Sequence, residues 1–316
     1  MHAPNLLVPL GWAPRARWGL LAAAGLALAA PAPARAALHV VTTVEGLAAL
    51  AREVGGNRVA VESLSRGVAD PHFVDANPML AVKLRNADLL VDVGLELEIG
   101  WLPPLVTQSR NPDIQPGGRK RLTAASAVKV LDLPTGPVDR SMGDLHPQGN
   151  PHFLNDPRRG LDVAAAIADR LAVLDPAGAS AYQSNLAAFR TRLTEAMEGW
   201  QHELEPLRGR KIFTEHRTFT YFLDWSGLVS AGELEPRPGV PPPPSHLAEL
   251  VQVARQQGVK EIVVENYYDT KSAEVVARST GAKVVQIPGD VGGEPSVRTY
   301  ADYVGLVVQR VAEGLR

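Results

Sequence analysis

The feature that most constrains the fold is an alternation of strand-like and helix-like segments that occurs twice along the chain. In the first half, strand patterns cover residues 39–44, 59–64, 88–94 and 128–133, with helical patterns at 46–54 and 78–86. In the second half, strand patterns cover 211–214, 228–233, 261–265 and 283–287, with helical patterns at 245–257 and 272–280. Ser245 is the expected N-cap of the first of these two helices. This alternation predicts two α/β lobes, each with a mostly parallel sheet flanked by helices.

A long amphipathic segment lies between the two halves. Its apolar positions recur at helical spacing, at Tyr182, Leu186, Phe189, Leu193, Ala196, Trp200 and Leu207. A helix over 179–207 would be roughly 40 Å long at 1.5 Å per residue. The pattern alone also fits one more helix packed on a sheet, but its length and position favour a rigid connection. We therefore expect an N-terminal lobe at 37–178, a connecting helix at 179–207 and a C-terminal lobe at 208–316.

The first 36 residues have the layout of a secretory signal peptide. Arg15 and Arg17 precede an apolar run at 18–30, and Ala34-Arg35-Ala36 supplies the small residues of a cleavage site. The run is too short to span a bilayer, and the prolines that follow it argue against a buried N-terminal helix. Cysteine is absent from the sequence, which excludes a lipid attached to that residue. These observations predict a secreted periplasmic protein that is not lipid-anchored.

The charge balance bears on the kind of partner. Removing residues 1–36 deletes three Arg and no acidic residue, so 29 basic residues face 34 acidic ones and the formal charge moves from −2 to −5. A mildly acidic chain is a poor match for nucleic acid or an anionic membrane. About 280 residues remain, enough for two lobes with cores of their own. We expect a monomer that binds neither nucleic acid nor membrane.

Four residues have the chemistry of metal ligands and suggestive positions. His72 follows the strand pattern at 59–64, His216 follows 211–214, Asp290 follows 283–287, and His152 lies in Gly149-Asn150-Pro151-His152. Open α/β sheets bind ligands at the carboxyl ends of their strands, and imidazole and carboxylate suit a divalent transition metal. No short HxxxH or CxxC spacing is present, and a single histidine in a loop is more often solvated. The residues alone therefore leave a metal site open.

Several ordered motifs resemble the zinc and manganese substrate-binding proteins of ABC transporters, the ZnuA/TroA type or cluster A-I. The resemblance covers essentially all of the chain after residue 36 and rests on the following segments: 41–43, Ala69-Asp70-Pro71-His72, 85–89, 94–96 with 101–102, Gly149-Asn150-Pro151-His152, 174–176, His216 with Phe219, Tyr221 and Phe222, 281–283, and Asp290. It implies two α/β lobes joined by a long helix, with metal held in the cleft between them.

Carried over position by position, the four ligands of that family fall on His72, His152, His216 and Asp290. The third position distinguishes the metals, because manganese-type members tend to have glutamate there and zinc-type members histidine. His216 therefore indicates Zn(II), and three imidazoles with one carboxylate suit a four-coordinate zinc ion. The set resembles the AztC branch most closely. Glu265 is the alternative fourth ligand if Asp290 points away from the metal.

His146 is a further candidate near the site, either as a residue that contacts incoming metal or as an ordinary loop histidine. Many zinc members of the family carry a long loop rich in His and Asp between the first two ligands, and this sequence has no run of histidines there. A dedicated metal-collecting loop is therefore not expected.

The resemblance predicts a periplasmic, high-affinity zinc-binding protein that delivers its ion to an ABC transporter permease with its ATPase. A periplasmic metallochaperone is a candidate loading partner. The nearest alternative is Mn(II) or Fe(II) binding on the same scaffold. A zinc-dependent hydrolase is the alternative from another class, with Glu265 as its general base. No HExxH, GxSxG or phosphate-binding glycine loop occurs, and four protein ligands would close the site to a substrate. We therefore expect no enzyme activity, and a metal affinity that falls below about pH 6.5, the ordinary pKa of histidine.

Overall fold

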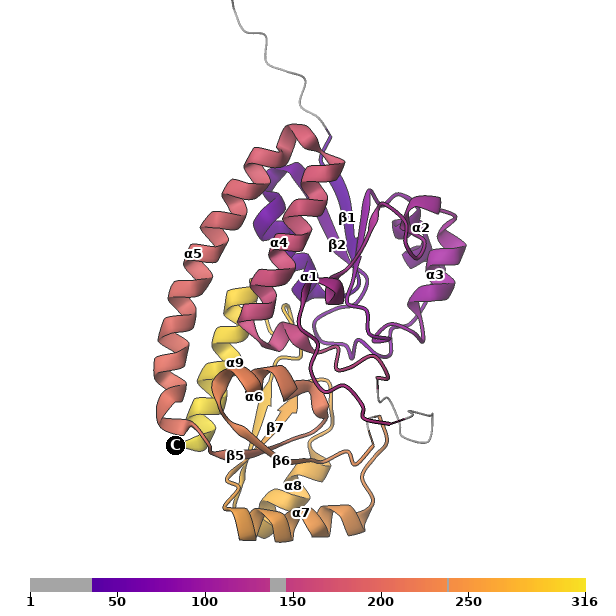
Figure 1. Ribbon diagram of the computed structural model, residues 1–316. Helices are drawn as coiled ribbons and strands as arrows, with labels where there is room; N and C mark the ends of the chain where they lie inside the picture. The colour runs from indigo at the N-terminus through magenta and orange to yellow at the C-terminus, as the bar shows by residue number, and fades with distance from the viewer. Residues whose placement is uncertain (1–35, 137–145, 238) are drawn as a thin grey trace, which may run out of the picture. The chain divides into compact units, whose positions relative to one another are not determined.

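The computed structural model describes residues 36–136, 146–237 and 239–316. The expected signal peptide thus lies outside the described residues except for Ala36. Within the described residues the chain forms two parallel four-stranded sheets with helices on both faces, and a long helix that runs along one side connects the two lobes (Figure 1). The predicted fold class is confirmed. The lobe boundaries stay predictions.

The first sheet has the strand order β2-β1-β3-β4, and all of its neighbouring strands are parallel. Its strands are β1 (Leu38–Thr42), β2 (Val59–Ser63), β3 (Leu89–Asp92) and β4 (Arg121–Thr123). Its helices are α1 (Glu45–Gly55), α2 (Pro78–Arg85), α3 (Leu102–Ser109) and α4 (Pro157–Leu174). Successive strand residues point to opposite faces, so Val40 packs in the core with α1 and α4 whereas Val41 packs with α2 and α3.

The second sheet repeats this topology in the order β6-β5-β7-β8, again parallel throughout. Its strands are β5 (Lys211–Thr214), β6 (Val229–Glu233), β7 (Glu261–Glu265) and β8 (Lys283–Ile287). Its helices are α6 (Thr220–Ser226), α7 (Pro244–Gln257), α8 (Lys271–Thr280) and α9 (Tyr300–Leu315). Phe213 and Ile262 pack with α7 and α8 on one face, and Ile212 and Val263 pack with α9 on the other.

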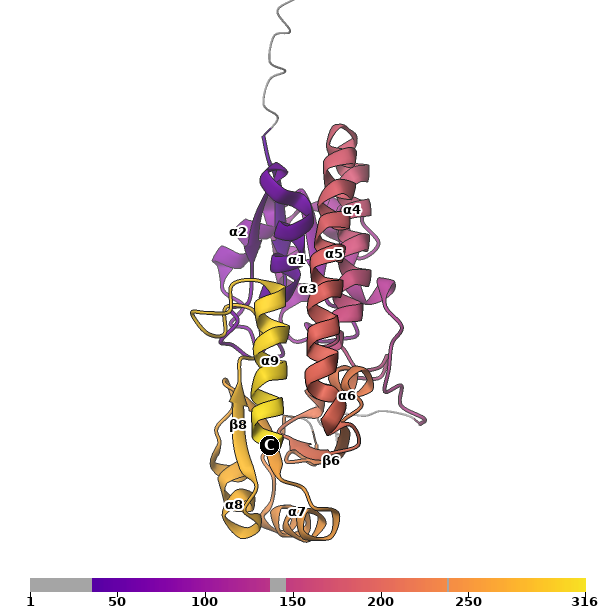
Figure 2. The same ribbon diagram turned by 90° about the vertical axis from the view of Figure 1, so that its left-hand side faces the viewer.

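The long helix α5 (Ala179–Leu204) confirms the predicted connection between the halves. Its buried side chains include Tyr182, Leu186, Phe189 and Leu193, the core of the predicted apolar stripe. The helix ends three residues earlier than expected, since Pro206 has no N–H to continue the α-helical hydrogen bonds, and a 3₁₀ turn follows at Glu205–Leu207. Helix α9 packs alongside α5 and also contacts α1 (Figures 1 and 2). One hydrophobic core therefore contains residues of both sheets.

Two local predictions were wrong. The range 128–133 does not form a strand: Asp132 has a positive φ of 57°, and Leu131 pairs instead with Asn150 and the Tyr221 hydroxyl. Strand β4 takes the edge of the sheet instead. Ser245 is not the N-cap of α7, because the helix begins one residue earlier at Pro244, and the first helical turn is a position where proline is well tolerated.

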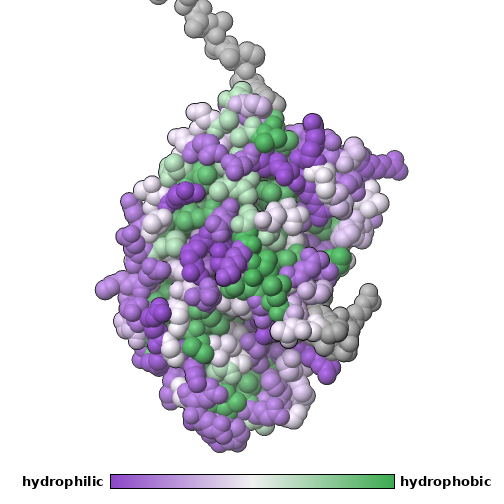
Figure 3. Space-filling view, viewed as in Figure 1, coloured by the Kyte–Doolittle hydropathy of each residue, from purple (hydrophilic) through white to green (hydrophobic). Residues whose placement is uncertain are grey.

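The surface mixes apolar and hydrophilic residues, as the face in Figure 3 shows. Among the large apolar side chains that reach solvent, Phe73 is 65% exposed and Ile99 is 63% exposed. Scattered exposed apolar residues of this kind are normal for folded proteins. In the part of the chain that the structure describes, no helix combines the length and the apolar composition that crossing a membrane requires.

Glu261 leads to a prediction about stability. The residue is fully buried at the start of β7, and burial raises its pKa to about 8, although Lys283 and Arg210 oppose the rise. A pKa above the unfolded value favours folding while the carboxyl is protonated, and this contribution is lost as pH rises through about 8. We expect Glu261→Gln to gain roughly 4 kcal/mol of unfolding free energy relative to wild type between pH 5 and pH 9.

Urea unfolding of the metal-free proteins at the two pH values measures this difference. Glu249→Gln is the matched control, because the Glu249 side chain is 76% exposed. A difference between Glu261→Gln and wild type that is the same at pH 5 and pH 9 would contradict the prediction.

Candidate metal centre

Two of the histidines are oriented by the same local device, an Asp or Asn two residues earlier with a proline between. Asp70 Oδ1 accepts the backbone N–H of His72 at 2.9 Å and lies 2.7 Å from its Nδ1. Asn150 Oδ1 does the same for His152, at 2.9 Å from the backbone nitrogen and 2.9 Å from Nδ1. The proline fixes the backbone between the two side chains. Each ring is thereby held at Nδ1, which leaves Nε2 for another partner.

His216 is held at Nδ1 from a neighbouring strand. It comes two residues after β5, and its Nδ1 lies 3.2 Å from Glu235 Oε2, in the segment that follows β6. The same carboxylate oxygen accepts the N–H of Gly239 at 2.9 Å, and the Thr214 hydroxyl donates to the His216 carbonyl at 2.8 Å. The His216 side chain is only 3% exposed. The ring is therefore oriented by Glu235, which is itself held by Gly239, and the His216 backbone is held by Thr214.

The structure brings His72, His152 and His216 together. One ligand nitrogen of each lies within 4.8 Å of the others, and each pair of ring centroids is 5.3 Å apart. The side chains of His72 and His216 are 7% and 3% exposed. Nε2 of His152 is buried and has no hydrogen-bond partner among the described residues. A buried nitrogen without a partner is costly, so this arrangement favours a bound cation.

The electrostatics of the site also favour a cation over protons. Burial, together with the neighbouring rings of His72, His216 and His146, holds the pKa of His152 well below its usual range. Burial, together with the rings of His72 and His216, lowers the pKa of His146 to about 3, against a smaller opposing hydrogen bond to Leu95. Neutral imidazoles are the form that binds metal. The rings are therefore available as ligands at neutral pH.

Buried carboxyl groups lie near the histidines. Burial raises the pKa of Glu215 to about 8, with further contributions from Glu235, Glu265 and Asp269. Burial likewise raises the pKa of Glu265 to about 7, with contributions from Asp70 and Glu235. The raised pKa values mean that the surroundings stabilise the ionised carboxylates poorly. A divalent ion nearby would favour these ionised forms. Glu265 itself is not among the residues whose ligand atoms converge.

Asp290 lies apart from the three converging rings. Its Oδ2 accepts the Gly46 N–H at 3.0 Å at the start of α1, and its Oδ1 lies 2.7 Å from the nitrogen of Val291. A Cβ at position 46 would come within 2.8 Å of Oδ1, so a larger residue there would displace the carboxylate. Burial raises the pKa of Asp290 to about 7. As a metal ligand Asp290 stays a prediction.

A small cavity borders the site on the side of Asp290. Its volume is about 60 Å³, and both His152 and Asp290 line it, together with Leu97, Tyr267 and Tyr303. Each Asp290 oxygen accepts one backbone N–H and keeps a further lone pair for another partner. The cavity is large enough to hold water between the carboxylate and His152.

Two residues that orient the site were not anticipated from the sequence. Asn150 was noted only as part of a motif, although its position two residues before His152 matches that of Asp70 before His72. Its Nδ2 donates to the carbonyl of Arg217 at 2.7 Å and to the Thr220 hydroxyl at 3.1 Å. Glu235 had no signal in the sequence, since only the pairing of β5 with β6 places it beside His216.

Comparison with known proteins agrees with this geometry. A family model described as "ZnuA: Zinc-uptake complex component A periplasmic" matches residues 40–314. The manganese ABC transporter substrate-binding lipoprotein PsaA of Streptococcus pneumoniae is 26% identical, over 88% of this chain and 89% of that protein. The metal ABC transporter substrate-binding lipoprotein ScbA of Streptococcus cristatus is 25% identical with the same coverage. A crystal structure of ZnuA has a TM-score of 0.74 and 26% identity, covering 89% of this chain and 100% of that one.

These relatives correct one expectation. PsaA and ScbA are both named lipoproteins, which contradicts the expectation of a periplasmic protein that is not lipid-anchored. The expectation rested on the absence of cysteine, and that absence concerns a single route of attachment. The absence of cysteine therefore does not establish that the chain is free of a membrane anchor.

Proposed function

Since the chain belongs to the ZnuA family, we propose that it is a high-affinity Zn(II)-binding protein that delivers zinc to an ABC importer. The general function is established by its relatives: this is a metal-binding substrate-binding protein of an ABC transporter. Proteins of this class work with a permease and an ATPase. The expectation that it is not an enzyme is likewise confirmed by the relatives, which are substrate-binding proteins. Its likeness to the AztC branch, its monomeric state and loading by a metallochaperone remain predictions.

The observation that carries the zinc assignment is the convergence of three imidazoles. Histidine supplies all three converging ligands, and no carboxylate joins the group among the described residues. Zinc is bound by nitrogen and sulfur donors in tetrahedral sites, whereas manganese favours oxygen donors. Manganese is nevertheless the rival with specific support, because PsaA is named for that metal.

A competition experiment tests the metal. We expect the purified chain, stripped with chelator and offered equal concentrations of Zn²⁺ and Mn²⁺, to retain one Zn²⁺ per chain and little Mn²⁺. The measurement is elemental analysis after rapid desalting. Retention of Mn²⁺ in preference to Zn²⁺ would overturn the zinc assignment and leave the transporter class intact.

The ligand set that we propose follows the sequence prediction, with His72, His152 and His216 as the core and Asp290 as the fourth ligand that the resemblance implies. His72 and His152 come from the chain before α5, and His216 comes from the chain after it. We propose that the first pair captures the ion and that His216 completes the site. A fourth protein ligand would close the coordination sphere, which suits transport rather than hydrolysis.

Zinc affinity should depend on pH, but less than for unperturbed histidines. Three imidazoles with an ordinary pKa near 6.5 would lose about tenfold each at pH 5.5, or about 1,000-fold together. The depressed pKa of His152 removes its share of this proton competition. We therefore expect the affinity to fall between pH 7 and pH 5.5 by clearly less than 1,000-fold. Competition with a chelator of known pH dependence measures this, and a steeper fall or no fall at all would contradict it.

A further inference from the structure

His72 lies in a connection that has no helix or strand of its own. This connection joins β2 to α2, and most of its residues are exposed or half-buried. Two local contacts give the chain around His72 its shape: Asp70 Oδ1 accepts the His72 N–H, and the Phe73 N–H donates to the Asp70 carbonyl at 3.1 Å. Both contacts lie within the turn itself. They therefore cannot fix where the turn lies relative to the first sheet.

Trp101, the residue before α3, supplies a contact from outside the turn. Its indole Nε1 donates to the Pro71 carbonyl at 2.9 Å. Among the described residues, the backbone of segment 66–76 makes one hydrogen bond to a residue distant in the sequence, and it is this one. Proline has no N–H, so the carbonyl is the only backbone group of Pro71 that can be held in this way. Trp101 therefore places the turn against the first sheet.

The peptide group between Pro71 and His72 is held at both of its polar atoms. Trp101 donates to its oxygen at 2.9 Å, and Asp70 Oδ1 accepts its N–H at 2.9 Å. A peptide group is planar, so two contacts on opposite sides fix the orientation of the plane. The same Asp70 oxygen also lies 2.7 Å from His72 Nδ1. The backbone that leads into His72 and the imidazole itself are thus fixed together.

Trp101 is itself firmly anchored. Its side chain is 2% exposed and belongs to the core that α2 and α3 cover on one face of the first sheet (Figure 1). Its backbone N–H donates to the Glu98 carbonyl at 3.1 Å. The buried Glu98 carboxyl accepts the N–H groups of Val93 at 2.7 Å and Gly94 at 3.1 Å, and the Thr43 hydroxyl at 2.6 Å. The indole is therefore tied to the ends of β1 and β3.

We propose that Trp101 is a positioning residue for zinc binding, whose indole N–H holds the Pro71 carbonyl and so places the His72 imidazole before the ion arrives. This inference rests on the proposed function, because it concerns a ligand of the same ion. A ligand that is already in place loses less conformational freedom on binding, so the contact should strengthen zinc affinity. Trp101 does not touch the metal and acts through His72.

Two changes at position 101 test the role of the indole N–H. Trp101→Phe removes the donor and part of the ring. Benzothienylalanine incorporated at position 101 keeps the shape of the side chain and removes the donor alone. We expect both proteins to bind Zn²⁺ about tenfold more weakly than wild type, the lower end of the effect of partners that orient metal ligands. Competition with a chelator at pH 7.5 measures the affinity.

Trp225→Phe is the matched control. Trp225 is also buried, at 5% exposed, but its indole nitrogen has no hydrogen-bond partner among the described residues. Replacing it removes the same atoms from a core without breaking a hydrogen bond of the indole. Trp225→Phe should therefore keep the zinc affinity of wild type, although urea unfolding should show that both phenylalanine variants are less stable than wild type.

A double-mutant cycle shows whether Trp101 acts through His72. In a His72→Ala background the further change Trp101→Phe should not alter the remaining zinc affinity, because the imidazole that it positions is gone. In a His216→Ala background the same change should still weaken binding about tenfold, since His72 is present. A residue that only stabilises the fold would weaken binding equally in both backgrounds.

Three results would overturn the proposal alone: wild-type affinity in the benzothienylalanine protein, an equal loss of affinity in Trp225→Phe, or an undiminished effect of Trp101→Phe in the His72→Ala background. A wild-type chain that takes up no Zn²⁺ would overturn the proposed function, and this inference with it. Circular dichroism shows whether each protein has folded. If Trp101→Phe does not fold, the benzothienylalanine protein, used also in the cycle, decides the question.

Discussion

Replacing His216 by alanine is expected to weaken zinc binding several hundredfold. Structural zinc sites bind their ion with about 10–16 kcal/mol, so each of four ligands carries about 3–4 kcal/mol. His216 is the converging histidine that the chain after α5 provides, and no exposed water can easily replace a side chain that is only 3% exposed. Chelator competition at pH 7.5 provides the measurement.

Glutamate at the same position is the informative companion of the alanine variant. His216→Glu keeps a ligand but exchanges nitrogen for oxygen, so the ratio of zinc affinity to manganese affinity should fall relative to wild type. His202→Ala, which removes an exposed histidine of α5, controls for the removal of a histidine. An affinity of His216→Ala within a factor of ten of wild type would remove His216 from the ligand set.

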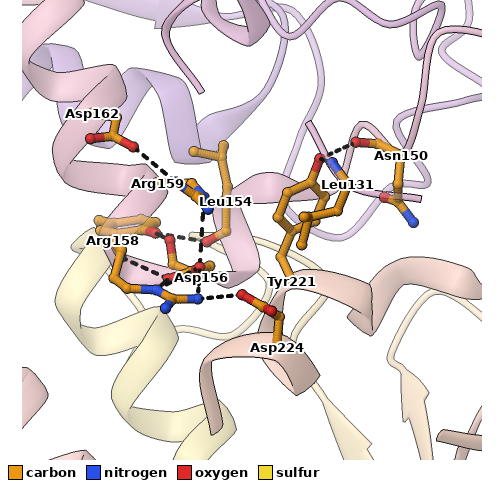
Figure 4. A network of polar contacts seen from close by, with 10 residues as sticks. Leu131, Asn150, Leu154, Asp156, Arg158, Arg159, Asp162, Tyr221 and Asp224 are labelled. Carbon is orange, nitrogen blue, oxygen red and sulfur yellow. Dashed lines mark hydrogen bonds and ion pairs between the residues drawn. The ribbon is translucent and has the colours of Figure 1, made fainter. Parts of the chain in front are cut away.

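The second large effect concerns Asp156, which is fully buried at the N-cap of α4. Its Oδ1 accepts the backbone N–H of Arg158 at 2.9 Å, and both carboxylate oxygens accept from the Arg158 guanidinium (Figure 4). That guanidinium also binds Asp224 of α6 at 2.6 Å. We expect Asp156→Ala to lower the free energy of unfolding by about 3 kcal/mol, from a lost cap and from the lost charge-assisted hydrogen bonds to Arg158.

Two variants separate the contributions. Asp156→Asn keeps an acceptor for the cap but loses the charge, so it should cost about half as much. Asp224→Asn should cost less than about 1 kcal/mol, because the Asp224 side chain is 49% exposed. Urea unfolding of the metal-free proteins measures all three. A cost of less than 1 kcal/mol for Asp156→Ala would show that the network in Figure 4 does not stabilise the fold.

Strands buried on both faces were the easiest elements to predict. The short apolar runs that became β3, β5 and β7 could be identified because parallel strands read as near-continuous apolar stretches. Helix α9 was not predicted, although its capping box of Thr299 and Asp302 is visible in the sequence. Helix α4 was also missed, even with Asp156 as its N-cap and proline at its first position.

The part of the site that lies at the carboxyl ends of strands could be predicted from the sequence. His72 and His216 could be expected to meet because each follows a parallel strand, and the family resemblance added His152. The contacts that orient the rings could not be foreseen where they depend on tertiary packing. Glu235 reaches His216 through the pairing of β5 with β6, which no local sequence pattern reveals.

Asn150 has a consequence for the speed of metal exchange. Through one side chain it is bonded both to His152 and to the backbone beside His216, so two ligands from opposite halves of the chain cannot move independently. Capture then requires little reordering, since the rings are already positioned when the protein folds. The same rigidity makes spontaneous loss of the ion slow. Any movement that separates the two halves at this point would have to break the hydrogen bond between Asn150 and Arg217.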